Sequence, residues 1–98
     1  MTIKETRADN TLTVSLTGRL DTLSAPELDQ FLEKNCPAID ALILDLKDLD
    51  YISSTGLRVI LKAQKALQDR GGVLIRNPNR IVSEVFAVTG FDTILRIE

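Results

Sequence analysis

The chain has 98 residues, of which 44% are hydrophobic and 27% charged, and its formal net charge is −2. This composition is typical of one soluble globular domain, and the slight acidic excess argues against a protein that binds nucleic-acid backbones. Histidine is absent from the sequence, which excludes Ser-His and Cys-His nucleophile pairs and histidine-ligated zinc sites.

The single cysteine and the short apolar runs indicate where the protein is located. Cys36 is the only cysteine, so no intrachain disulfide can form, and this suits a reducing compartment. No apolar run approaches the roughly 18 residues that span a bilayer. We therefore expect one domain over residues 1–98, located in the cytoplasm, with no membrane insertion, no metal and no cofactor.

A β-hairpin is predicted at the start of the chain. Residues 2–5 favour a short strand, and residues 8–10 (Ala-Asp-Asn) favour a turn, because Asp and Asn tolerate turn geometry. Residues 11–17 alternate between apolar and hydroxyl side chains, which predicts a strand with one buried face.

The first helix follows a loop over residues 18–21. Residues 24–27 (Ser-Ala-Pro-Glu) have the pattern of a capping box with proline in the first turn. The apolar residues of the helix recur at helical spacing, and it is predicted to end near Asn35, before Pro37. Those inward residues are Leu28, Phe31 and Leu32.

The second half of the sequence alternates strands and helices. Residues 41–46 predict a central parallel strand that is apolar on both faces, and residues 55–68 an amphipathic helix. Residues 73–76 and 94–97 predict short strands. A third helix is expected to begin at Asn77-Pro78 and to stop at Gly90. Its inner face is predicted to hold Ile81, Val82, Val85, Phe86 and Val88.

The element order is therefore ββαβαβαβ. Because short crossovers between parallel strands have one hand, helices that follow successive strands tend to stack on the same side of the sheet. We predict an α/β fold of two layers, in which helices cover mainly one face of a mixed, mostly parallel sheet.

Three consecutive hydroxyl residues, Ser53, Ser54 and Thr55, fall where the central strand gives way to the second helix. The free backbone N–H groups and the dipole at a helix start favour an anion, so a phosphate would be stabilised there. Helix N-caps alone commonly use Ser or Thr, but three in a row exceed what a cap needs. Gly56 then removes side-chain bulk, which would let a partner approach closely.

Acidic residues gather near the end of the same strand, at positions 45, 48 and 50. A metal site or a phospho-aspartate is one interpretation, because ligands often bind at the carboxyl ends of parallel strands. A receiver domain would need paired acids after an early strand, but Asp21 has no acidic neighbour. Turn chemistry and solvation explain Asp48 and Asp50 equally well.

A catalytic role for these serines finds no support in the sequence. A serine between a strand and a helix resembles the hydrolase elbow, but the flanking residues do not match Gly-x-Ser-x-Gly. No histidine exists to act as the base. We therefore predict no catalytic residue, and the chain is not expected to be an enzyme.

The motifs together resemble the STAS domain family, which includes bacterial anti-sigma factor antagonists and the cytoplasmic tails of sulphate transporters. The first mark is the stretch over 17–21 (Thr-Gly-Arg-Leu-Asp), before the first helix. The second is the run from Leu44 through residues 52–57 (Ile-Ser-Ser-Thr-Gly-Leu). The third combines Gly71-Gly72, Asn77-Pro78 and residues 89–91 (Thr-Gly-Phe). The resemblance spans nearly the whole chain.

The resemblance implies a function in partner switching. By matched position Ser54 is the residue that an anti-sigma factor with GHKL-type serine kinase activity would phosphorylate, with Thr55 and Ser53 as alternatives. The unmodified protein would bind that anti-sigma factor and release a sigma factor; a phosphatase would reset the switch. The implied partner-binding residues, including the loop expected from Asp48, are Asp21, Asp48, Ser53, Ser54, Thr55, Gly56 and Arg58. We expect a monomer or weak dimer.

One position departs from the family pattern: Ser53 stands where the family has an aspartate. This leaves open a second interpretation, in which the chain is a non-phosphorylated STAS scaffold or sensor subunit of a larger complex, for signalling or lipid transport.

Overall fold

The computed structural model describes all 98 residues and opens with the predicted hairpin. Strands β1 (Thr2–Ala8) and β2 (Thr11–Leu20) pair antiparallel around a tight turn at Asp9 and Asn10. Asp9 adopts the left-handed conformation, with φ at 56°, which Asp tolerates better than most residues. The loop predicted over 18–21 is wrong for its first three residues, because β2 continues to the fully buried Leu20.

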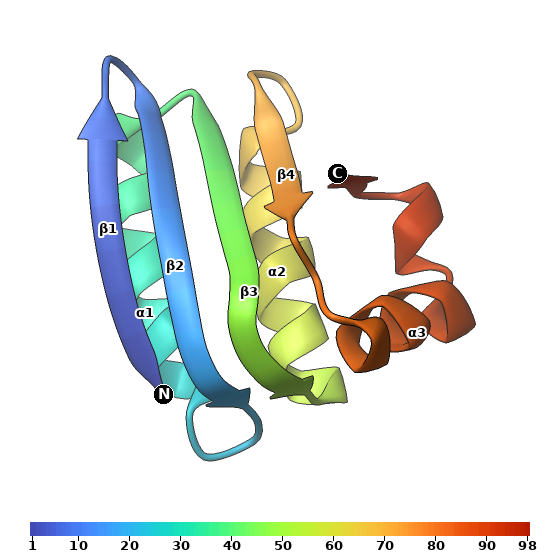
Figure 1. Ribbon diagram of the computed structural model, residues 1–98. Helices are drawn as coiled ribbons and strands as arrows, with labels where there is room; N and C mark the ends of the chain where they lie inside the picture. The colour runs from blue at the N-terminus through green and yellow to red at the C-terminus, as the bar shows by residue number, and fades with distance from the viewer.

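The remaining strands complete a five-stranded sheet in the order β1-β2-β3-β4-β5, parallel from β2 onward. They are β3 (Ala41–Ile52), β4 (Gly72–Arg76) and β5 (Arg96–Ile97). Helices α1 (Ala25–Asn35) and α2 (Ser54–Leu67) lie behind one face of the sheet (Figure 1). The helix α3 (Arg80–Thr89) lies beside the end of β4, and short 3-10 turns occupy Cys36–Ala38 and Phe91–Thr93. The predicted ββαβαβαβ order and mixed two-layer fold are confirmed.

Strand β3 differs from its prediction in length and in burial. It continues six residues past Leu46 to Ile52, and its pairing with β2 shifts register twice, each time with an extra residue on β3. Leu42 and Leu44 are fully buried, but Ala41 and Ile43 on the other face are partly exposed. The apolar run therefore does not indicate a strand covered on both sides, because helices cover only one face.

The start of α3 also differs from its prediction. Asn79, not Asn77, is the N-cap: its Oδ1 accepts the N–H of Val82 at 2.8 Å. The Asn79 Nδ2 donates to the carbonyl of Leu49 at 2.8 Å, which ties the helix start to β3. Asn77 instead adopts the left-handed conformation, with φ at 56°.

The core consists of 24 buried hydrophobic residues, and no polar or charged residue is buried. Helix α3 contributes only Val82 and Phe86 to it, so the predicted inner positions Ile81 and Val88 are wrong; Val88 is 87% exposed. None of the helices combines the length and the apolar character that crossing a membrane requires.

The burial of α3 predicts a contrast between two substitutions. Phe86→Ala should lower the free energy of unfolding by about 3–5 kcal/mol, because a fully buried aromatic ring leaves a cavity. Val88→Ala should change it by less than about 0.5 kcal/mol, because the side chain is exposed. Urea unfolding measures both; a loss in Val88→Ala as large as in Phe86→Ala would contradict this packing of α3.

Candidate functional site

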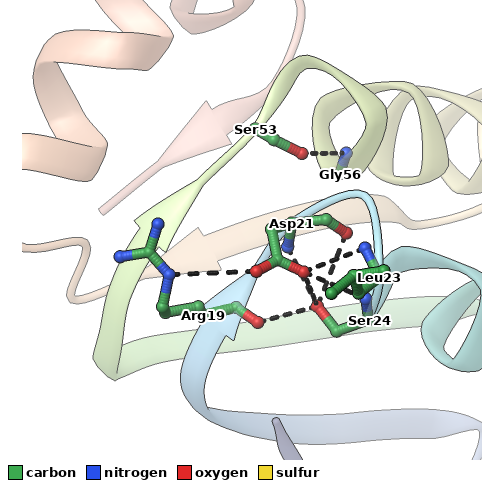
Figure 2. A network of polar contacts seen from close by, with 6 residues as sticks. All are labelled: Arg19, Asp21, Leu23, Ser24, Ser53 and Gly56. Carbon is green, nitrogen blue, oxygen red and sulfur yellow. Dashed lines mark hydrogen bonds and ion pairs between the residues drawn. The ribbon is translucent and has the colours of Figure 1, made fainter.

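The candidate site lies where β3 ends and α2 begins. Ser53 is the N-cap of α2, in an extended conformation, and its Oγ accepts the N–H of Gly56 at 3.2 Å (Figure 2). The N–H groups of Ser54 and Thr55 belong to the first helical turn, where no carbonyl four residues earlier lies within the helix. The helix start therefore presents unpaired donors beside the hydroxyls.

The structure gives the three hydroxyls different surroundings. Ser53 is partly buried and caps the helix, and the Oγ1 of the partly buried Thr55 lies 3.4 Å from that of Thr22. Ser54 is exposed, and its hydroxyl takes no part in these contacts. Of the three side chains, Ser54 is therefore the one a visiting protein can reach most freely.

The structure requires glycine at position 56, but for a different reason from the one expected. It is buried, and a Cβ at this position would lie 2.6 Å from Cγ of Leu20 and 3.2 Å from Cγ1 of Ile52. The space beside Gly56 is thus occupied by the protein's own core. The expectation that Gly56 leaves room for a partner is wrong, and the residue instead lets α2 pack closely on the end of β2.

The segment after β2 is held by Asp21. Its Oδ1 accepts the N–H groups of Leu23 at 3.0 Å and Ser24 at 3.1 Å, while Oδ2 lies 3.8 Å from Nε of Arg19 (Figure 2). The backbone N–H of Ser24, helped by its hydroxyl and opposed by partial burial, holds the pKa of Asp21 below its usual 3.8. Asp21 therefore fixes the shape of this loop.

Ser24 does not form the predicted capping box. Its Oγ makes no cap bond to α1; it donates to the carbonyl of Arg19 at 2.7 Å and accepts the N–H of Asp21 at 2.9 Å. The serine therefore closes a turn over residues 21–24 before the helix begins.

A separate contact links β2 to β3: the Arg19 guanidinium lies 4.5 Å from the ring centre of Tyr51, a cation–π contact.

The structure brings together most, but not all, of the predicted site residues. The backbone N–H of Ser53 donates to the carbonyl of Leu20 at 2.9 Å, which places the 21–24 loop beside Ser53, Ser54 and Thr55. Arg58 is exposed, one turn further along α2. Asp48 is not in a loop: it lies within β3, about 13 Å from Ile52 along the strand at 3.3 Å per residue.

The acidic residues at positions 45, 48 and 50 do not converge. Asp45 Oδ1 accepts the N–H of Lys47 at 3.1 Å, and no three His, Cys, Asp or Glu residues lie close enough to hold a metal ion. Sequence reasoning missed Thr22 and Leu23. The pattern Asp21-x-x-Ser24 is typical of a turn as well as of the residues before a helix. If the turn had been considered as an alternative to the capping box, Thr22 and Leu23 would have been predicted at its exposed tip.

Comparisons with known proteins give a consistent result. The sequence model of the family described as "Mlab, STAS domain" matches residues 3–96. The anti-sigma-B factor antagonist of Bacillus subtilis is 32% identical over 90 residues, which cover 91% of this chain and 83% of that protein. BtrV of Bordetella bronchiseptica is 34% identical over 93 residues, which cover 93% of this chain and 80% of that protein.

Solved structures share the fold. The anti-sigma factor antagonist SpoIIAA in its unphosphorylated form superposes with a TM-score of 0.85 at 19% identity, covering 99% of this chain and 88% of that one. The phosphorylated form of SpoIIAA, from Bacillus, gives a TM-score of 0.77 at 18% identity, covering 99% and 91%. Identities this low establish the shared fold alone.

The packing of Gly56 against Leu20 predicts a coupled pair of substitutions. Gly56→Ala gains about 1 kcal/mol of helix propensity, but crowding in the core costs about 1–3 kcal/mol, so we expect a net loss of stability. In a Leu20→Ala background the same change should cost less or be stabilising, because the two nearest atoms belong to Leu20 and are gone, while only the looser contact with Ile52 remains. A double-mutant cycle by urea unfolding measures this; equal effects in both backgrounds would contradict the contact.

The contacts of Asp21 predict its titration. A carboxylate 13C titration followed by NMR should give a midpoint below 3.8. Ser24→Ala should raise that midpoint, because it removes the hydroxyl that lies 3.2 Å from Oδ1 of Asp21 and shares its one proton between this oxygen and the carbonyl of Arg19. Because the folded-state pKa is depressed, Asp21 stabilises the fold above about pH 4, and this stability is lost as the pH falls through the folded-state pKa. A midpoint at or above 3.8 would show that the loop is not held in this way.

Proposed function

The chain belongs to the STAS domain family, and we propose that it is an anti-sigma factor antagonist, which binds an anti-sigma factor and thereby frees a sigma factor. The observation that carries this proposal is the exposed Ser54 in the first turn of α2, beside a loop of fixed shape. The name of the Bacillus subtilis relative supports the choice of partner. A protein of this kind acts by binding, not by catalysis.

The switch in this proposal is a phosphoryl group on Ser54. Ser53 is engaged as the helix cap and Thr55 lies against Thr22, so the Ser54 oxygen is the most accessible acceptor of the three. A partner with GHKL-type serine kinase activity would transfer the group, and a phosphatase would remove it. The structure of SpoIIAA in its phosphorylated form supports this proposal, because it is a phosphorylated protein of the same fold.

Phosphorylation would favour the free protein for an electrostatic reason. The group adds a charge of about −1.5 to −2, and the unpaired N–H groups of the first turn would stabilise it. Arg58 follows Ser54 by four residues, the spacing of neighbours on one helix face, and forms none of the ion pairs in the structure. Burying this charge against a partner that lacks a matching cation would be strongly unfavourable.

A second candidate function rests on Ser53. Its hydroxyl makes the cap bond that an aspartate would also make, so the fold of the junction is kept while the negative charge of the family aspartate is lost. In that case the same surface would bind a partner constitutively, as a scaffold or sensor subunit of a larger complex.

Kinase labelling distinguishes the two functions. We expect incubation with ATP and the GHKL-type anti-sigma factor kinases of the source organism, each purified, to add one phosphoryl group, which mass spectrometry maps to Ser54. Ser54→Ala should abolish labelling, while Ser53→Ala and Thr55→Val should retain it. Since Ser53→Ala removes a cap worth about 1 kcal/mol, its folding is checked in parallel.

A phosphoryl group on Ser53 or Thr55 would contradict the assignment of the acceptor. Absence of labelling with every such kinase, together with tight binding to one of them, would replace the switch with the constitutive scaffold.

A further inference from the structure

The most exposed large hydrophobic side chain in the protein is that of Leu23, at 91%. Single exposed apolar residues are common on protein surfaces, so exposure by itself indicates nothing. Two features set Leu23 apart: the backbone that carries it is held by side-chain contacts, and its chain neighbour Thr22 contacts Thr55, the residue after the proposed phosphorylation site.

The loop that carries Leu23 has its conformation fixed before any partner binds. The N–H of Leu23 donates to Oδ1 of Asp21 at 3.0 Å, and the next N–H, that of Ser24, donates to the same oxygen at 3.1 Å. The Ser24 hydroxyl joins Arg19 and Asp21 from the other side. A side chain on such a loop loses little backbone entropy when it is buried in a complex, because its backbone is already ordered.

The segments that carry Leu23 and Ser54 are in direct contact. Thr22 and Thr55 are in contact through their Oγ1 atoms at 3.4 Å, and Leu23 and Ser54 are the chain neighbours of these two threonines. The bond from the Ser53 N–H to the Leu20 carbonyl joins the same two segments. We therefore expect a partner that covers Ser54 to reach Leu23 as well.

We infer that Leu23 is the apolar anchor of this surface and enters an apolar pocket on the anti-sigma factor. This inference rests on the proposed function. Binding energy in protein interfaces concentrates in a few central side chains that are fully desolvated and ringed by polar groups. In the complex, the polar residues that flank Leu23 in the chain, Asp21, Thr22 and Ser24, would form such a ring, with Ser54 across the contact between Thr22 and Thr55.

This arrangement also connects the anchor to the switch. The pocket excludes water from Leu23 only if the polar ring closes against the partner. A phosphate dianion on Ser54 carries more negative charge than Arg58 can neutralise and therefore needs hydration or a further cation, so it opposes that closure.

The test compares affinities for the anti-sigma factor kinase that binds the unmodified protein, by isothermal titration calorimetry. Leu23→Ser should weaken binding at least about tenfold, the loss expected for a hot-spot side chain, while Leu23→Met should stay within about threefold. Val88→Ser is the matched control, because Val88 is 87% exposed and lies on α3, an element separate from both the 21–24 loop and the start of α2. It should bind within about twofold of the unmodified protein. Thermal unfolding confirms that the variants are folded.

The outcomes separate the two proposals. If the unmodified protein binds but Leu23→Ser binds equally well, or Val88→Ser loses as much affinity, the anchor is overturned and the proposed function stands. If the unmodified protein binds none of the purified anti-sigma factors of its organism, the proposed function fails and the anchor fails with it.

Discussion

The close contact between Leu20 and Gly56 is the constraint on which the site depends. Leu20 ends β2 fully buried, and it fills the space in which any side chain at position 56 would lie. This contact lets the first turn of α2 approach the end of β2, and the Ser53 N–H then reaches the Leu20 carbonyl at 2.9 Å. Two segments more than thirty residues apart thereby form one surface.

Each segment at this junction is then held by its own short-range hydrogen bonds. Asp21 and Ser24 hold the loop after β2, and Ser53 holds the start of α2. The side chains of these three polar residues are engaged in hydrogen bonds within the protein. The side chains of Ser54 and Leu23 are exposed and hold no part of the junction in place. A frame held by these hydrogen bonds, which exposes one hydroxyl and one apolar side chain, suits the proposed docking surface, because ordered backbone loses little entropy on binding.

The sequence predicted the order of the elements, because period-two alternation and helical spacing report local burial. The motif over residues 52–57 also indicated the junction of β3 and α2, where the structure exposes Ser54. It could not show that Leu20 occupies the space beside Gly56, since that contact joins residues distant in sequence. Nor could helical spacing tell that Ile81 and Val88 lie outside the narrow buried stripe of α3. The choice of Asn79 over Asn77 as the cap depends on the Leu49 carbonyl, which only the fold brings near.

The decisive quantity is the change in affinity for the anti-sigma factor when a single phosphoryl group is placed on the Ser54 oxygen. Protein carrying phosphoserine at position 54, made by genetic incorporation, can be compared with the unmodified protein by calorimetry. We predict that binding weakens at least about a hundredfold, because the phosphoryl charge of about −1.5 to −2 exceeds the single positive charge of Arg58, and the excess cannot be buried without a further cation. Equal affinities for the two forms would show that the exposed hydroxyl at the start of α2 does not control docking.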